Sequence, residues 1–221
     1  MRETNYKVQD FSLGVRRRKT QLKDYIPDNV DLAPLLYQTG YLTIKGFDSE
    51  YNQYILKYPN NEVQYAFLDC LAPAYLPEPV YDSGVFINHF CDDLKNGDPE
   101  SLMNRLKSLF AALPYTANEN ETVTEYNFQC VIYLVFMISG QFVNVEYQTS
   151  FGRADCVVKT AQNIYLFEFK RDKSAEAALA QIEEKNYAAA FASDERKLYK
   201  IGANFSTSER NLTEWKIVEG K

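Results

Sequence analysis

The chain has 221 residues, of which 46% are hydrophobic, which is enough for a globular protein with one large domain or two modest ones. It has no apolar run of 18 residues and no signal-peptide pattern at its start, so we expect a cytoplasmic protein without a membrane span. The net charge of −6 divides into −3 for residues 1–115 and −3 for residues 116–221, which argues against a basic arm for nucleic acid.

Residues 1–60 contain few clear elements. The first thirty are polar and indicate a linker or a helix remnant, and the basic run at 16–19 is interpreted either as a phosphate contact or as a solvated helix face or linker. An apolar helix pattern from 31 to 40 and two β-rich stretches at 41–45 and 54–58 then predict a helix and a small β-hairpin. This order is typical of a winged-helix-like unit; the alternative is a helical-hairpin spacer with no binding role.

Residues 61–115 are predicted to form a helical connector. Asn60 and its neighbours can cap one helix, and Asp98 followed by Pro99 opens another, with aspartate as the cap and proline at the first helical position. The segment offers no candidate catalytic or ligand-binding residues. Pro114 and the polar residues 116–120 mark a domain boundary.

Residues 116–221 show a regular α/β pattern. A helix opens at Thr122 and closes at Gly140, three strands follow, and an alanine-rich helix precedes two last strands. The predicted strands and second helix cover residues 142–149, 152–160, 163–170, 174–191, 197–205 and 212–218. The order is therefore α-β-β-β-α-β-β, and no phosphate-binding loop of the P-loop type occurs in it.

Two acids on neighbouring predicted strands carry the candidate chemistry. Asp155 lies five residues before Thr160, and Glu168 lies five residues after Asn163. In a tight hairpin that pairs Thr160 with Asn163, the two carboxylates lie opposite each other with Cβ atoms about 5 Å apart, a spacing that one hard cation can bridge. Lys170 is two residues beyond Glu168 and points to the same face. A loop longer by one residue would reverse this parity.

The candidate metal is Mg²⁺ or Mn²⁺, because the histidine and cysteine side chains that bind zinc are scarce. His89 is the only histidine, and the four cysteines form no C-x-x-C pair, so zinc chemistry has few ligands. Oxygen ligands suit magnesium or manganese. The alternative to a metal site is a structural ion pair of Lys170 with Asp155 or with Glu168 at the end of a buried strand.

The G-R-A-D motif at 152–155 and the F-E-F-K motif at 167–170, between one helix bearing Glu125 and another starting at 174, resemble the PD-(D/E)XK nuclease superfamily. The chain most resembles the bacterial branch in which the nuclease-like domain follows an AAA-ATPase-like domain. Segments 36–45 and 58–63 are similar to the region between those two domains. The resemblance implies a restriction-endonuclease-like core with a mixed central sheet flanked by helices. It also implies that residues 1–60 are the tail of an ATPase-like module in a longer protein.

The resemblance also implies roles for single residues. Asp155 and Glu168, with the backbone carbonyl of Phe169, would bind Mg²⁺ or Mn²⁺, and Lys170 would orient or activate the attacking water. Glu125 resembles an acid of the first core helix, although its spacing from Thr122 is also that of a capping box.

Three further polar residues are candidates for the site. Gln181 resembles a helix glutamine near the active site of RecB-like nucleases. Four residues later the expected tyrosine is replaced by Lys185, which makes Lys185 a candidate phosphate contact. Arg153, inside the G-R-A-D motif, is the other residue that we expect to contact nucleic acid.

Two functions are compatible with these residues. The first is metal-dependent hydrolysis of phosphodiester bonds in DNA or RNA by a nuclease coupled to an ATPase-like module. The alternative is a catalytically silent nuclease-fold domain that binds nucleic acid or protein as a regulatory module. The intact acids and lysine favour the first function, and the net negative charge favours the second.

Overall fold

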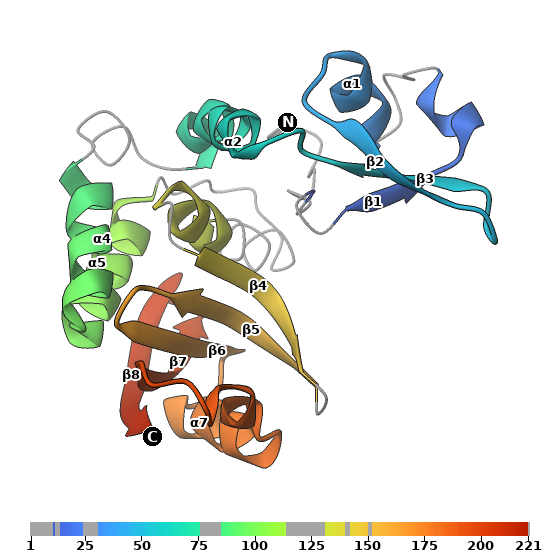
Figure 1. Cartoon of the computed structure of the whole chain (residues 1–221). Helices are drawn as coiled ribbons and strands as arrows, with labels where there is room; N and C mark the ends of the chain where they lie inside the picture. The colour runs from blue at the N-terminus through green and yellow to red at the C-terminus, as the bar shows by residue number, and fades with distance from the viewer. Residues whose placement is uncertain are drawn as a thin grey trace. The chain divides into compact units, whose positions relative to one another are not determined.

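The computed structural model describes residues 11, 14–23, 31–75, 85–113, 131–139, 142–149 and 152–220. The packing of the chain divides it into two compact units, Met1–Ala74 and Tyr75–Lys221, and each has a sheet of its own (Figure 1). Among the described residues, no helix is both long and apolar enough to cross a membrane. The predicted division at residues 60 and 115 stays a prediction.

The first unit contains a small antiparallel sheet in the order β1-β3-β2. Its elements are β1 (Val15–Arg17), η2 (Lys19–Leu22), α1 (Ala33–Gln38), β2 (Thr43–Asp48), β3 (Gln53–Lys57) and α2 (Asn61–Tyr75). The helix and hairpin predicted from 31 to 58 are present. The interpretation of residues 16–19 as a helix face or linker is wrong for Arg16 and Arg17, because both lie in β1 and pair with β3.

The second unit contains a five-stranded sheet in the order β4-β5-β6-β7-β8, in which β6 and β7 run parallel and the other pairs antiparallel. Its strands are β4 (Phe142–Thr149), β5 (Gly152–Lys159), β6 (Asn163–Arg171), β7 (Lys197–Ser206) and β8 (Asn211–Gly220). Its helices are α4 (Val85–Asn96), α5 (Pro99–Ala112), a helical segment at 131–138, α7 (Ala175–Glu184) and η3 (Tyr187–Phe191). The predicted α/β order and the mixed sheet flanked by helices are confirmed.

Helices cover both faces of the five-stranded sheet (Figure 1). On one face, Leu166 and its neighbours pack with Ile182 of α7 and Phe191 of η3. On the other face, Phe167 contacts Phe136 of the helical segment edge to face. The second predicted helix was expected to run to residue 191, but it ends at Glu184 because Asn186 takes a left-handed conformation with φ of 46°.

The helix α7 approaches β7 to backbone contact at Gly202. A Cβ atom at this position would lie 2.5 Å from the carbonyl oxygen of Ala175 and 2.7 Å from the amide nitrogen of Leu179. Only glycine allows such an approach. Gly202 also pairs with Glu168 across the parallel strands, so α7 is held close to the candidate site.

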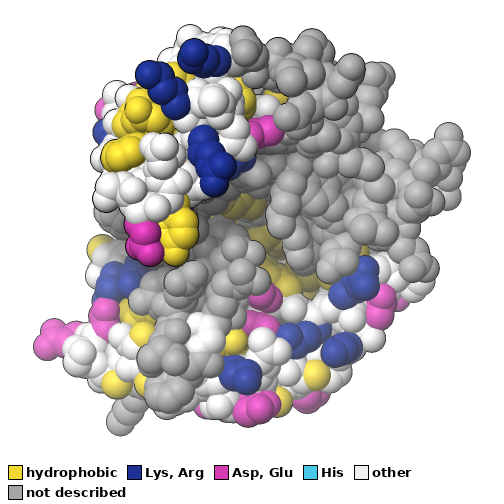
Figure 2. Space-filling model, turned by 90° about the vertical axis from the view of Figure 1, so that its right-hand side faces the viewer, with side chains coloured by type: hydrophobic (Ala, Val, Ile, Leu, Met, Phe, Trp, Pro, Cys, Tyr) yellow, Lys and Arg dark blue, Asp and Glu magenta, His cyan; other side chains and the backbone are white. Residues whose placement is uncertain are grey.

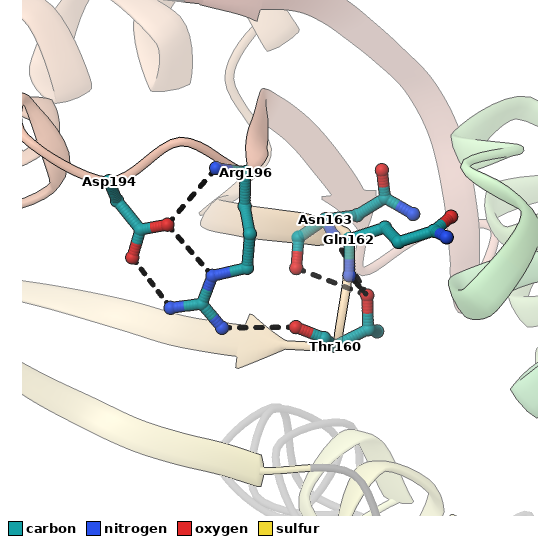
Figure 3. Close-up of polar contacts among 5 residues, drawn as sticks. All are labelled: Thr160, Gln162, Asn163, Asp194 and Arg196. Atoms are coloured by element: carbon teal, nitrogen blue, oxygen red, sulfur yellow. Dashed lines mark hydrogen bonds and ion pairs between the residues drawn. The ribbon is translucent and has the colours of Figure 1, made fainter.

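A closed turn sets the register between β5 and β6 (Figure 3). Thr160 N–H donates to the carbonyl of Asn163 (2.8 Å), and Asn163 N–H donates to Thr160 Oγ1 (2.9 Å). Arg196, the residue before β7, donates to the carbonyl of Thr160 (3.0 Å) and to the carboxylate of Asp194 at 2.6 and 2.8 Å. The observed ladder, from Lys159 opposite Ile164 onward, confirms the predicted register.

Side chains of the sheet donate hydrogen bonds to backbone carbonyls at the C-terminal end of helix α4. The carbonyl of Leu94 accepts hydrogen bonds from Asn163 Nδ2 (3.3 Å) and Tyr165 Oη (2.6 Å). The carbonyl of Gly97 accepts another from Tyr199 Oη (3.0 Å). The last carbonyls of a helix have no partner inside the helix, so these side chains supply the partners they need. The end of α4 and these side chains of the sheet therefore satisfy each other's hydrogen bonds.

This dependence yields a test of where the folding unit begins. A fragment of residues 75–221 should unfold in one cooperative thermal transition. A fragment of residues 116–221 should unfold at a lower temperature or without cooperativity, because Asn163, Tyr165 and Tyr199 lose their partners and the apolar face under α4 and α5 meets water. Circular dichroism at increasing temperature measures both. Equal transition temperatures would instead support the predicted boundary near residue 115.

Candidate active site

The candidate site lies where β5 and β6 face α7. The side chain of Asp155 on β5 is partly buried, and its Oδ2 accepts a hydrogen bond from the backbone N–H of Phe169 on β6 (2.8 Å). This bond ties Asp155 to the strand segment that also carries Glu168 and Lys170. The structure thus brings together the two acids that the hairpin register predicted to be neighbours.

Lys170 joins the strand to the helix. Its ammonium donates to Glu168 Oε1 (2.8 Å) and to Gln181 Oε1 of α7 (2.5 Å). Gln181, expected near the site from its resemblance to a helix glutamine of RecB-like nucleases, contacts Lys170 directly. The alternative to a metal site, a structural ion pair, predicted a contact between Glu168 and Lys170, and this contact is present. The same two residues would also take part in a catalytic site.

Glu168 is the most buried acid of this group. Its residue is 1% exposed, and Oε2 has no hydrogen-bond partner among the described residues. Burial raises the pKa of Glu168, the nearby charge of Asp155 raises it further, and Lys170 opposes the rise. A buried carboxylate oxygen without a donor is costly, so it is expected to have another partner.

A hard divalent cation fits this unpartnered oxygen. Glu168 Oε2, the carboxylate of Asp155 and the carbonyl of Phe169 are oxygen donors of the kind that Mg²⁺ and Mn²⁺ prefer. Within the described part of the chain, no group of three or more histidine, cysteine, aspartate or glutamate side chains could hold a metal. A site here would therefore combine two carboxylates with a backbone carbonyl. Glu125, the predicted third acid, lies outside the described residues.

The two predicted nucleic-acid contacts have different outcomes. Lys185 is exposed and caps the C-terminus of α7, where its N–H donates to the carbonyl of Gln181 (2.9 Å). It thus lies about one helical turn from the Gln181–Lys170 contact. The side chain of Arg153 lies outside the described residues.

A set of polar contacts fixes the loop between β6 and α7. Asn204, which pairs with Lys170 across the parallel strands, accepts from Lys173 N–H (2.8 Å) through Oδ1 and donates to Thr213 Oγ1 (3.0 Å). Asp172, with φ of 50°, accepts from Thr207 N–H (2.8 Å) and from its hydroxyl (2.7 Å). These contacts determine the path of the chain from Lys170 to the helix that carries Gln181.

The N-terminus of α7 is fixed in the same way. Ser174 Oγ accepts from Ala177 N–H (3.1 Å), and Glu214 Oε2 on β8 accepts from Ala175 N–H (3.0 Å). The sequence predicted a helix from residue 174 but not the contacts of Asn204, Asp172 or Glu214. Their partners lie in other elements of the fold, and only an assignment of which strands are neighbours would have identified them.

The fold and the site define the class of the second unit: it has a restriction-endonuclease-like fold with two acids and a lysine on adjacent strands. Residues 123–215 match the sequence model of the family described as PD-(D/E)XK nuclease superfamily. This match supports the assignment of the second unit to that superfamily.

The chain is also similar to a curated protein described as "Uncharacterized protein in vnfD 5'region" from Azotobacter chroococcum mcd 1. The two are 31% identical over 193 residues, which cover 83% of this chain and 37% of that protein. The chain therefore spans well under half the length of this relative.

The raised pKa of Glu168 predicts how stability depends on pH in the absence of metal. A raised pKa means that the stability is greatest when Glu168 is protonated and falls as pH rises through the pKa of the folded state. Asp155→Asn removes the nearby charge but keeps an oxygen for Phe169 N–H. It should therefore stabilise the metal-free protein by about 1 kcal/mol at pH 7. The gain should vanish as the pH falls below the raised pKa of Glu168, because the protonated acid no longer repels Asp155. Urea unfolding with EDTA at a series of pH values measures this, and a constant gain would contradict the electrostatic origin.

The loop contacts predict a local effect of Asn204→Ala, for which Asn163→Ala is a matched control. Both asparagines are buried in strands and bind backbone groups, but at opposite ends of the sheet. Each change should cost about 1–3 kcal/mol of stability. Only Asn204→Ala should increase amide hydrogen exchange at residues 171–176 while the protein stays folded. Equal exchange in the two variants would mean that Asn204 does not hold this loop.

Proposed function

We propose that residues 116–221 of the second unit form a metal-dependent nuclease, which hydrolyses phosphodiester bonds of nucleic acid. The observation that carries this proposal is the buried carboxylate of Glu168, which has one oxygen on Lys170 and the other without a hydrogen-bond partner among the described residues. Buried ionisable groups with shifted pKa values concentrate at functional sites. The superfamily match supports the same reaction class, since its nucleases generally use divalent metals.

Each residue of the site would have its own role in hydrolysis. Asp155, Glu168 and the carbonyl of Phe169 would hold Mg²⁺ or Mn²⁺, which when bound polarises a phosphate and lowers the pKa of a water. Lys170 keeps its ammonium beside Glu168 and can donate to a phosphate oxygen or steer the proton of the attacking water. Gln181 restrains Lys170 from the helix side, which keeps the ammonium near the acids.

Three predicted residues extend this assignment. Glu125 would add a further acid from the first core helix, unless it serves only as the capping residue of that helix. Arg153 and Lys185 would contact the phosphates of the bound strand. The exposed position of Lys185 on α7 is compatible with such a contact.

We also propose the wider setting. The substrate would be DNA or RNA, and a preceding ATPase-like module in a longer protein would act on the same substrate. The relative from Azotobacter chroococcum is long enough to hold such a module, because the matched region covers 37% of it. A cytoplasmic location is compatible with Cys70, Cys91 and Cys156, which form no disulfide.

A second candidate is a catalytically silent nuclease-fold domain with a regulatory role. Two observations favour it: Lys170 already neutralises part of the buried charge, and the second unit has 15 lysines and arginines against 21 aspartates and glutamates. Such a domain would not require a divalent metal. Metal binding therefore separates the two candidates.

The test combines metal binding with cleavage. Calorimetry with MnCl₂ should show binding to the wild type and none to Asp155→Asn. Labelled single-stranded and double-stranded DNA and RNA, incubated with Mg²⁺ or Mn²⁺, should be cut by the wild type. Lys170→Met should keep its fold and its metal but lose cleavage by roughly 10²–10⁴-fold, the range of a positioned acid–base group.

Two outcomes would contradict the proposal. Equal manganese binding by wild type and Asp155→Asn would remove the metal assignment. Cleavage by Lys170→Met at the wild-type rate, with metal saturating, would remove the lysine from the mechanism. If Lys170 is purely structural, Lys170→Met should instead lose about 3 kcal/mol of stability, because a buried charge is left without its partner.

A further inference from the structure

The start of β5 is held differently from the rest of the strand. The ladder between β5 and β6 ends where Cys156 lies opposite Phe167. Residues 152–155 continue beyond it as a hairpin with β4, and Figure 1 shows this hairpin passing the end of β6. Asp155, a proposed metal ligand, therefore lies on a part of β5 that has left the ladder with its other neighbour.

This part of the hairpin needs support beyond its strand pairing. A hairpin of two strands is only marginally stable in water. Toward β6, the ladder is replaced by a side-chain contact, in which Asp155 Oδ2 accepts a hydrogen bond from Phe169 N–H (2.8 Å). A further contact that restrains the hairpin would keep Asp155 beside Glu168.

The position of each acid matters because the surrounding surface carries charges of both signs. In Figure 2 the described side chains of the second unit include dark blue and magenta ones close together. A surface of mixed sign produces little net field. Binding of a divalent cation therefore depends on where Asp155 and Glu168 lie, and so on what supports the start of β5.

Tyr187 of η3 provides such a support. It is 2% exposed and belongs to the same buried cluster as Ala154. Its ring lies against Gly152, where a Cβ atom would be 3.3 Å from both Cε1 and Oη of the tyrosine. Gly152 has φ of 147°, which glycine adopts without strain. The first residue of β5 thus lets the ring of Tyr187 pack closely against the backbone of the strand.

A break in the helix directs Tyr187 to this position. Asn186, with φ of 46°, turns the chain from α7 into η3, which contacts β5. The two buried aromatic rings of η3 lie at opposite ends of β5. Tyr187 lies at Gly152, the first residue of the strand. Phe191 lies at Lys159, the last residue, with 5.0 Å between the ammonium and the ring centroid.

We propose that Tyr187 is a positioning residue of the candidate site. Its ring supports the start of β5 and so holds Asp155 beside Phe169 and Glu168. This support acts in the metal-free protein as well. Its effect on metal binding rests on the proposed function, because a displaced Asp155 would weaken a site that needs two carboxylates.

The test follows the amide hydrogen of Phe169, which donates to Asp155. Hydrogen exchange measured by NMR in EDTA reports how often this bond opens. The amide of Thr160, just beyond the other end of β5, donates to the carbonyl of Asn163 and is the internal reference.

Three variants separate the role of the ring from that of the common core. Tyr187→Leu removes the ring, and Tyr187→Phe keeps it and removes only the hydroxyl. Phe191→Leu is the matched control, because it removes a ring from the same short helix and the same cluster. Gly152→Ala, at an exposed position, places a methyl group against the ring and tests the same contact if Tyr187→Leu does not fold.

Tyr187→Leu should exchange the Phe169 amide at least about tenfold faster relative to Thr160, because local opening of the hairpin becomes easier. Gly152→Ala should change this ratio in the same direction, whereas Tyr187→Phe and Phe191→Leu should leave it within about twofold. In calorimetry with MnCl₂, Tyr187→Leu should bind about tenfold more weakly than Phe191→Leu, as is typical when a residue that orients a metal ligand is lost. Thermal unfolding confirms that each variant is folded.

Two results would overturn the proposal. An unchanged exchange ratio in Tyr187→Leu would mean that the ring does not hold Asp155. An equal rise in Phe191→Leu would mean that either ring acts only through the stability of the shared core. Failure of the wild type to bind manganese would instead defeat the proposed function alone. The exchange of Phe169 would still decide the role of Tyr187, so the two failures are distinguishable.

Discussion

The closed turn from Thr160 to Asn163 is the constraint on which the candidate site depends. Side chains alternate along a strand, so one extra residue in this turn would send Asp155 to the face opposite Glu168. The turn is closed twice, by its own hydrogen bonds and by Arg196, which directly precedes β7. Residues far from the acids, with no chemistry of their own, determine whether the acids meet.

The same register obliges the protein to bury a charge. Glu168 lies in a strand covered on both faces, where burial and the charge of Asp155 both disfavour its ionised form. Lys170 relieves part of this cost, and one carboxylate oxygen remains without a hydrogen bond among the described residues. An apolar residue here would pack more stably in the absence of metal. A bound cation at the site would offset the cost of burying this acid.

The sequence predicted the second unit well because its signals are local. Alternating apolar residues and a four-residue turn each determine an element or a register over short distances, and together they located Asp155, Glu168 and Lys170 side by side. The resemblance suggested only that Gln181 lies near the site; its contact with Lys170 is seen in the structure.

The features that were missed depend on distant partners or on single backbone angles. Asn204 contacts Lys173 only because β7, which follows β6 in the chain after helix α7, pairs with β6 in parallel. The three residues of β1 are too few to show a strand pattern, and the β3 residues with which they pair lie about forty positions further along the chain. The break at Asn186 is one left-handed residue within an alanine-rich sequence of high helix propensity.

Gly202 has a consequence for how this domain can vary. Because the backbones of α7 and β7 touch there, the separation of helix and sheet is set by main-chain atoms, not by the size of the side chains between them. The reach from Gln181 to Lys170 then depends little on which apolar residues fill the surrounding core, such as Leu179 and Ile182. Substitutions in that core can accumulate over generations without changing the geometry of the polar contact, whereas position 202 itself has no such freedom.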